Sequence, residues 1–281
     1  MDELTWVEYL KRKVNKGKDV IASVGDDCAI VRHGKEYMLL TSDLFIENIH
    51  FKRDKISLYN IGQRAVGRAL SDIVSCAGVP RFVGISAGLP TYLSTRGLKS
   101  IFSGIKDYCR KYKVSIIGGD TARASCLFLD IWAIGATKKY VLRSGARVGD
   151  YIFVTGKLGR LKFNQPFSLR LYEIRSLVTK FNISAMIDVS DGFILDTYRI
   201  VKESGKGVLV YGDKVPVTRG MRDMFRGEDY EIIFTVNKSE DIDALKKKYF
   251  LVGQIKPKSW GYKIKFGNTI NDLALKGYLH F

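Results

Sequence analysis

The sequence predicts an α/β (α+β) protein of two domains, which we expect at residues 1–137 and 138–281. Three observations lead to this prediction. At about 150 residues per domain, a chain of 281 residues has room for two domains. Apolar runs of strand length alternate with helical patterns in both halves. A composition of 46% hydrophobic and 27% charged residues, with only 5 prolines, is typical of a globular protein and excludes disordered or collagen-like chains.

The first half opens with apolar residues at helical spacing, which predict a helix over residues 4–14. The compact apolar run 37–40 predicts a strand that ends in polar residues. Within 58–77 every fourth residue is apolar, which indicates a helix with one buried face, and a glycine and a proline follow to end it. The remaining predicted elements of this half are the strand 82–89, the helix 98–112 and the strands 114–119 and 126–135.

The second half begins with an irregular connector, residues 138–150, and continues with a mixture of strands and helices. No repeat of fixed period is present. Its predicted elements are the strand 151–156, the helix 169–181, the strand 184–188, a helix after residue 191, the strands 207–212 and 230–236, a helix from residue 239, and the strands 250–255 and 262–266.

Charge, cysteines and hydropathy limit the function classes. The chain has 46 Lys and Arg against 29 Asp and Glu, a net charge of +17, so nucleic acid, anionic lipid and phosphorylated small molecules are the first partners to consider. The 4 cysteines form no CxxC pair and show no metal-type spacing with the 3 histidines, which argues against zinc. No uncharged run reaches membrane-span length and the start is acidic and amphipathic, so we expect a cytoplasmic protein outside the membrane.

Carboxylates recur where apolar runs stop, mostly beside Gly, Ser or Thr. Any one of these motifs is also compatible with an ordinary turn or helix cap. Together they predict an acidic cleft, and hard oxygen ligands of this kind suit Mg²⁺ bound with substrate phosphates. The acid-bearing segments are GDDCAIV (25–31), TSD (41–43), LSD (70–72), GGDTAR (118–123), DVSDG (188–192) and GEDYE (227–231).

Two of these motifs favour function over a plain turn. DVSDG places two carboxylates three residues apart at a strand-to-helix junction, and GGDTAR joins two glycines, an acid, a hydroxyl and an arginine after a strand. No P-loop string and no GxGxxG loop occurs in the sequence. A bound nucleotide would therefore be held through metal ions.

Taken in order, GDDCAIV, TSDLFIENIHF, LSDIVSCAG, IIGGDTAR, LRSGARVGD, TGKLG, DVSDG and GEDYEIIFTV resemble the thiamine-monophosphate kinase family, over a span from about residue 24 to the terminal GYLHF. This family belongs to the superfamily of aminoimidazole ribonucleotide synthetase. The resemblance implies two α/β domains, ATP binding without a P-loop, and a homodimer formed through the N-terminal domain. It assigns ATP and metal binding and dimerisation to residues 1–137, and completion of the ATP and substrate site to residues 138–281.

The implied reaction is Mg²⁺-assisted transfer of the ATP γ-phosphoryl group to thiamine monophosphate, which yields thiamine diphosphate and ADP. An acceptor phosphate is already ionised, so we expect direct in-line transfer and assign no general base. The resemblance implies that Asp27, Thr41, Ser42, Asp43, Asp72, Asp120, Asp188 and Asp191 hold Mg²⁺. It implies that Phe102, Gly119, Asp120, Arg143 and Ser190 contact ATP, and that His50, Glu228 and Tyr278 contact thiamine monophosphate.

The chain departs from the family pattern in two places. Residues 160–183 are shorter than the usual helical stretch and lack its Pro-and-Arg element, and residues 218–226 are also short. Arg226 stands where the family usually has a glycine. Both departures fall on the expected substrate side, so they bear on the acceptor and leave the metal and ATP chemistry intact.

Two alternatives remain open at this stage. The first is another ATP-dependent enzyme of the superfamily, such as selenophosphate synthetase, aminoimidazole ribonucleotide synthetase or the hydrogenase-maturation dehydratase. The absence of cysteine from the first 25 residues and from the last residues disfavours selenium or carbamoyl chemistry. The second is a basic nucleic-acid-binding protein, which the scattered lysines and arginines and the lack of a recognised binding motif make the weaker alternative.

Overall fold

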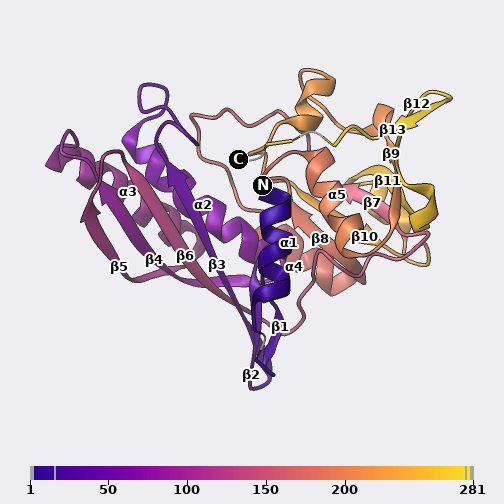
Figure 1. Cartoon of the computed structure of the whole chain (residues 1–281), viewed down its shortest axis with the longest axis horizontal. Helices are drawn as coiled ribbons and strands as arrows, with labels where there is room; N and C mark the ends of the chain where they lie inside the picture. The colour runs from indigo at the N-terminus through magenta and orange to yellow at the C-terminus, as the bar shows by residue number, and fades with distance from the viewer. Residues whose placement is uncertain (1–2, 16, 276, 279–281) are drawn as a thin grey trace.

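The computed structural model describes residues 3–15, 17–275 and 277–278. The first half of the chain forms a six-stranded sheet of order β1-β2-β3-β6-β4-β5, with two long helices (Figure 1). Its elements are α1 (Glu3–Lys13), β1 (Val20–Ala22), β2 (Ala29–His33), β3 (Glu36–Ile46), α2 (Leu58–Ser75), β4 (Val79–Leu89), α3 (Thr95–Tyr112), β5 (Ser115–Arg123) and β6 (Phe128–Thr137).

The second half forms a seven-stranded sheet of order β13-β12-β9-β11-β7-β10-β8. The predicted α/β (α+β) class is therefore confirmed, with one sheet in each half. Its helices and strands are β7 (Tyr151–Val154), α4 (Leu171–Lys180), β8 (Ile183–Asp188), α5 (Phe193–Glu203), β9 (Gly207–Tyr211), β10 (Ile232–Val236), α6 (Ile242–Lys246), β11 (Phe250–Lys256), β12 (Tyr262–Phe266) and β13 (Thr269–Asp272), with short 3₁₀ turns at Gly212–Lys214, Met221–Phe225 and Lys258–Trp260.

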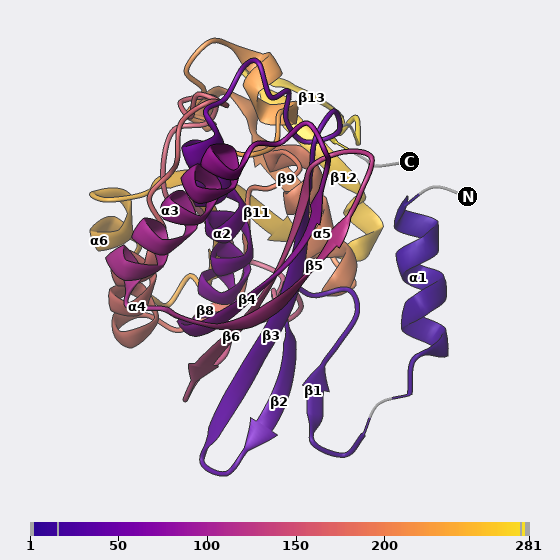
Figure 2. The ribbon, with the colours of Figure 1, turned by 90° about the vertical axis from the view of Figure 1, so that its left-hand side faces the viewer.

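Helix α2 lies at the centre of the first half. Ser57 caps its start by accepting a hydrogen bond from the Asn60 N–H at 3.2 Å. The residues that recur every fourth position are buried as the sequence predicted, from Ile61 through Ile73. Helices α2 and α3 cover one face of the six-stranded sheet, whereas α1 stands beyond the other face (Figure 2). We call this second face the open face.

Two glycines allow α2 and α3 to approach closely. A Cβ atom at Gly62 would lie 2.1 Å from the Ile101 carbonyl oxygen, and one at Gly104 would lie 2.0 Å from the Tyr59 carbonyl oxygen. Both distances are far below van der Waals contact, so neither helix has room for a side chain at these two positions. The position of α2 over the sheet, and with it every side chain that α2 sends to the pocket described below, depends on this contact.

Substitution of Gly104 by alanine should destabilise the protein by about 2 kcal/mol or more, because the added methyl forces the helices apart. This loss should exceed the roughly 1 kcal/mol that alanine gains over glycine in helix propensity. Urea unfolding measures the change. Lys99→Ala, at an exposed position of the same helix, is the matched control and should stay within about 0.5 kcal/mol. Equal stability of the two variants would contradict the close packing.

The sequence missed two strands at the ends of the sheets, β1 and β13. They have 3 and 4 residues, and all four residues of β13 are exposed, so neither leaves a burial pattern to recognise. The connector 138–150 contains no helix or strand, as predicted. Strand β6 ends at Thr137, but the apolar core that includes α2 continues into the second half through Phe167 and Met186. The division at residue 137 therefore stays a prediction.

No helix in the described part of the chain is long and apolar enough to cross a membrane.

Candidate active site

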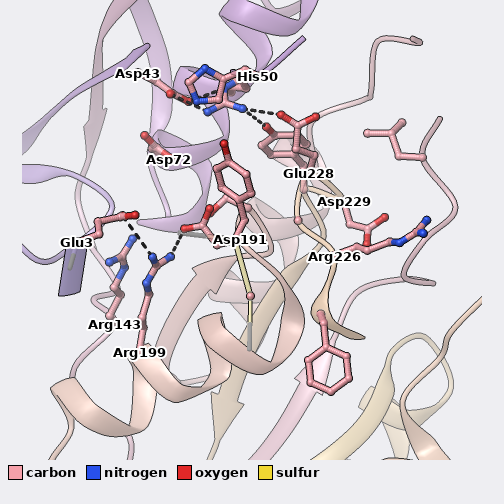
Figure 3. A pocket seen from close by; sticks show the side chains of 18 of the residues that line it. Glu3, Asp43, His50, Asp72, Arg143, Asp191, Arg199, Arg226, Glu228 and Asp229 are labelled. Atoms are coloured by element: carbon pink, nitrogen blue, oxygen red, sulfur yellow. Dashed lines mark hydrogen bonds and ion pairs between the residues drawn. The ribbon is translucent and has the colours of Figure 1, made fainter. Parts of the chain in front are cut away.

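A pocket of about 1170 Å³ is lined by residues from both halves of the chain (Figure 3). The first half contributes the segment before β2, the end of β3 and α2. The second half contributes the loop after β7, the junction before α5 together with the last turns of that helix, and residues 225–230. Helix α1 also lines the pocket and is tied to α5 by ion pairs from Lys11 to Glu203 at 2.7 Å and from Lys202 to Glu8 at 3.1 Å.

Three carboxylates from distant parts of the sequence meet beside this pocket. Asp27 precedes β2, Asp72 lies on α2 and Asp188 ends β8, and one oxygen of each lies within 4.8 Å of the others. Hydroxyl groups orient all three. The donors are Ser75 to Asp27 at 2.6 Å, Thr41 to Asp72 at 2.7 Å and Ser71 to Asp188 at 2.5 Å. We call Asp27, Asp72 and Asp188 the carboxylate cluster.

The carboxylate cluster holds more negative charge than its buried surroundings favour. Burial, and then the charges of neighbouring carboxylates, raise the pKa values of Asp72 and Asp188 well above the ordinary range. Asp188 is only 1% exposed, so water does little to screen it. Three converging oxygen donors whose charge is poorly compensated fit a hard divalent cation such as Mg²⁺.

The Arg143 guanidinium partly compensates this charge. Its Nε donates to Asp27 Oδ1 at 3.0 Å and its Nη2 makes an ion pair with the same oxygen. Its backbone N–H donates to Asp26 at 3.1 Å. Burial and the adjacent Asp27 raise the pKa of Asp26 to about 6. Arg143, predicted to contact ATP, therefore lines the pocket and contacts the cluster.

The junction between β8 and α5 presents Ser190 and Asp191 to the pocket. The N–H groups of Asp191 and Gly192 both donate to Asp196 at 3.1 Å, so a carboxylate within the helix caps its own start. Gly192 has φ of 118°, a conformation that favours glycine. Arg199 makes ion pairs with Asp191 and with Asp196. DVSDG is thus a sharp turn that directs polar groups into the pocket.

The three residues predicted on the substrate side all line the pocket. His50 accepts a hydrogen bond from the Ile46 N–H at 3.0 Å. The Tyr278 N–H donates to the Asp191 carbonyl oxygen at 2.9 Å. Figure 3 shows His50 and Glu228 on the side of the pocket where Asp43 lies, away from Arg143 and Arg199.

Strand β3 divides the predicted metal residues between two faces of its sheet. Thr41 and Asp43 point toward α2, because they bond Asp72 and Arg68. Ser42 lies on the open face, where its hydroxyl donates to Asp130. Asp120 shares this face, because Asp130 pairs with Ser86 in β4 and Ser86 pairs with Asp120 in β5. Within one chain, Asp120 therefore points away from the carboxylate cluster.

Gly119 and Phe102, like Asp120, do not line the pocket. Gly119 pairs with Ile85, three strands from β3 in the sheet, so its Cα is about 14 Å from that of Asp43 at the usual strand spacing. Phe102 lies on α3 and is 51% exposed. The structure thus brings together most of the predicted residues. It leaves Gly119, Asp120 and Phe102 apart from them, whereas Ser42 lines the pocket although its hydroxyl donates to Asp130 on the open face.

Comparisons with known proteins bear on the family to which this chain belongs. A family profile described as "AIR synthase related protein, N-terminal domain" matches residues 25–142. A curated protein from Buchnera aphidicola subsp. Acyrthosiphon pisum, named thiamine-monophosphate kinase, is 32% identical over an alignment of 316 positions, which covers 98% of this chain and 97% of that protein. The chain belongs to the thiamine-monophosphate kinase family. Another curated member, from Aquifex aeolicus, is 28% identical and covers 75% of this chain and 80% of its own length.

Solved structures agree on the fold of the thiamine-monophosphate kinase family. One, described as "AaThiL complexed with AMPPCP and TMP", superposes with a TM-score of 0.86 at 24% identity, over 100% of this chain and 97% of that one. A HypE-HypF complex superposes with a TM-score of 0.77 at 19% identity, over 95% of this chain and 98% of that one. Because the hydrogenase-maturation protein shares the architecture, fold alone does not separate the alternatives, whereas sequence identity does.

Sequence reasoning predicted Arg143 but missed Arg64, Arg68 and Arg199 of the pocket. Arg64 and Arg68 lie on α2, two turns and one turn before Asp72, and Arg199 lies on α5. The signal was present, because residues 64, 68, 72 and 75 share one helix face at the spacing of successive turns. The predicted acidic cleft is also wrong in detail, since acidic and basic side chains line the pocket in nearly equal numbers. Buried carboxylates need positive side chains beside them, and the segments were chosen for their acidic residues, so most of the pairing arginines lay outside those segments.

The raised pKa values of Asp72 and Asp188 predict how pH acts on the metal-free protein. The folded state binds these protons more tightly than the unfolded state. The stability that they contribute is therefore present at low pH and should be lost as pH rises above the ordinary pKa range of a carboxyl group. Mg²⁺ competes with the same protons, so the increase in Tm that it causes should be larger at pH 8 than at pH 5.5. Thermal unfolding with EDTA and with Mg²⁺ tests this. An Mg²⁺-induced shift independent of pH would contradict metal binding at the cluster.

Proposed function

We propose that this chain transfers the γ-phosphoryl group of ATP to the phosphate of thiamine monophosphate, giving thiamine diphosphate and ADP. Membership of the thiamine-monophosphate kinase family supports the activity. The structurally similar protein AaThiL was solved in complex with AMPPCP, an ATP analogue, and TMP. The observation that carries the chemistry here is the buried carboxylate cluster beside a pocket large enough for two phosphorylated ligands.

The reaction must bring two phosphate groups together. Two unit charges about 4 Å apart repel by about 4 kcal/mol at an effective dielectric constant of 20. Mg²⁺ held by Asp27, Asp72 and Asp188, with Asp43, Asp191 and Thr41 nearby, would supply charge neutralisation and phosphate orientation. Arg143 and Ser190 bind ATP in this proposal, and His50, Glu228 and Tyr278 orient the acceptor. The transfer is direct and in line, and no residue of the chain acts as a general base.

We further propose that a second copy of the chain completes the site with Gly119 and Asp120, whereas Ser42 already lines the pocket of its own chain. The open face carries the exposed apolar side chains of Leu44 (47%) and Phe82 (42%), and β5 is an almost wholly exposed edge strand. Such a face and edge favour association with another chain. A symmetric dimer would bring the partner's Asp120 toward a pocket that its own chain keeps it from. Phe102, on the opposite side of the sheet, stays a sequence prediction.

Incubation of the protein with ATP, Mg²⁺ and thiamine monophosphate, followed by chromatography, tests the assignment. Thiamine diphosphate and ADP should form in equal amounts, and EDTA should abolish both. The shortened loop after β7 lines the pocket near Arg226 and Asp229, so the acceptor should be varied in the same assay. A folded protein that forms no thiamine diphosphate would refute the assignment of the acceptor.

A further inference from the structure

We propose that Arg68 is a positioning residue that couples Asp43 to Glu228 across the pocket. By binding both carboxylates it fixes Glu228, on the acceptor side of the pocket, relative to the carboxylate cluster. Its positive charge also lowers the affinity of the cluster for the metal ion. The acceptor part rests on the function proposed above, whereas the metal part does not. The two carboxylates come from different halves of the chain, β3 and the segment before β10, and a single guanidinium connects them.

The hydrogen bonds of Arg68 occupy nearly its whole guanidinium. Nε and Nη2 each donate to one oxygen of Asp43 at 3.0 Å, which is a bidentate pair. Nη1 donates to Glu228 at 2.7 Å and to the Tyr230 hydroxyl at 3.2 Å. The group packs against the Phe45 ring, 5.3 Å from its centroid. With its donors so used, Arg68 is better suited to hold side chains in place than to capture a phosphate.

Arg64, one turn earlier on α2, holds the same carboxylate from its other side. Its Nη2 donates to the second oxygen of Glu228 at 2.5 Å, and its Nη1 donates to the Gln165 carbonyl oxygen at 2.8 Å. Its side chain is completely buried. Glu228 has φ of 68°, unusual for a residue other than glycine, and its N–H donates to the Ser190 carbonyl oxygen at 2.8 Å. The backbone and the carboxylate of Glu228 are therefore both held in place.

This arrangement has opposite consequences for the two ligands. Arg68 places a positive charge beside Asp43. Thr41, two residues earlier on the same face of β3, donates to Asp72 of the carboxylate cluster. That charge opposes a divalent cation at the cluster, because like charges repel in a site shielded from water. The same guanidinium fixes Glu228, which the acceptor must meet. Loss of Arg68 should therefore strengthen metal binding and weaken acceptor binding.

A merely structural ion pair would behave differently. If Arg68 only joined the two halves of the chain, its removal would loosen the pocket, and metal and acceptor would both bind more weakly. Stronger metal binding together with weaker acceptor binding would therefore indicate coupling, whereas weaker binding of both ligands would indicate a structural role alone. Lysine at this position keeps the charge, but its ammonium group lacks the planar set of donors with which a guanidinium hydrogen-bonds two carboxylates at once. Arg68→Lys therefore separates the effect of charge from the effect of geometry.

The experiment compares Arg68→Met and Arg68→Lys with wild type in two assays. Electron paramagnetic resonance measures Mn²⁺ binding to the protein without nucleotide, and steady-state kinetics gives KM for thiamine monophosphate at saturating ATP. Arg110→Met is the matched control, because it removes an arginine that pairs with Asp107 at 3.0 Å on the outer helix α3. It should leave both quantities unchanged.

We expect Arg68→Met to lower the Kd for Mn²⁺ by about three- to tenfold and to raise KM for the acceptor by about tenfold or more, with a smaller change in kcat. Arg68→Lys should retain the wild-type Kd for Mn²⁺ and still show the raised KM. Weaker or unchanged Mn²⁺ binding in Arg68→Met, or an unchanged KM in either variant, would overturn the proposal.

If thiamine monophosphate proves not to be the acceptor, Mn²⁺ binding still decides the metal part. If Arg68→Met does not fold, a raised KM with unaltered Kd in Arg68→Lys supports the proposal, and parallel weakening overturns it.

Discussion

Replacement of Asp188 by asparagine should reduce turnover by at least about a hundredfold while leaving Tm unchanged or higher. Asp188 is buried in the carboxylate cluster, and burial together with the Asp27 charge already disfavours its ionised form. Asparagine removes that charge, and its carbonyl oxygen can still accept the hydrogen bond that Ser71 donates. Activity and stability should therefore change independently, as expected of a residue kept for function at a cost to stability.

The matched control is Asp150→Asn. Asp150 is also completely buried and accepts hydrogen bonds from the Arg147 N–H at 2.9 Å and the Ser184 hydroxyl at 2.6 Å, but it does not line the pocket. It should keep turnover near the wild-type value and lose stability, because an amide replaces a fully bonded carboxylate. Kinetics and thermal unfolding measure both variants. Wild-type turnover in Asp188→Asn would remove this residue from the metal site.

A mixture of two inactive variants should recover activity if the second chain completes the site. Asp120→Asn should be inactive although Asp120 points away from its own carboxylate cluster. In a mixed dimer with Asp188→Asn, one of the two sites pairs an intact Asp188 with an intact Asp120, while the other carries both changes. Random exchange of subunits should therefore restore about a quarter of wild-type turnover.

The control mixes Asp188→Asn with Asp72→Asn. Both residues belong to the cluster within a single chain, so no mixed dimer has an intact site and no activity should return. The mixtures are unfolded together, refolded and assayed, with their mass checked by light scattering. Absence of recovery in a dimeric Asp120→Asn and Asp188→Asn mixture would show that Asp120 does not act across the interface.

Local sequence patterns were sufficient for most of the fold. The apolar spacing in 58–77 gave the buried face of α2, and carboxylates after apolar runs gave Asp27 and Asp188 of the cluster. These features depend on periods of two to four residues, which a single sequence displays directly. Strands β1 and β13 escaped recognition because short edge strands bury too little to impose such a period.

Pairing across long sequence distances could not be predicted. Arg68 contacts Glu228, 160 positions later in the chain, and no local pattern announces that contact. The separation of Ser42 from Asp43 was foreseeable, since neighbours in a strand face opposite sides. That Asp120 shares the face of Ser42 follows only from the strand order β3-β6-β4-β5, which requires the assembled sheet. The sequence therefore predicted which residue types form the site better than it predicted which of these residues contact one another.

Transfer of labelled phosphate tests the central claim most directly. The protein is incubated with Mg²⁺, thiamine monophosphate and ATP labelled in its γ-phosphate, and the label is followed in the separated products and in the acid-quenched protein. We predict that label appears in thiamine diphosphate in equal amount to ADP, with none bound to the protein. Label found only in inorganic phosphate, or covalently on the protein before it reaches the acceptor, would contradict direct transfer between two phosphates in this pocket.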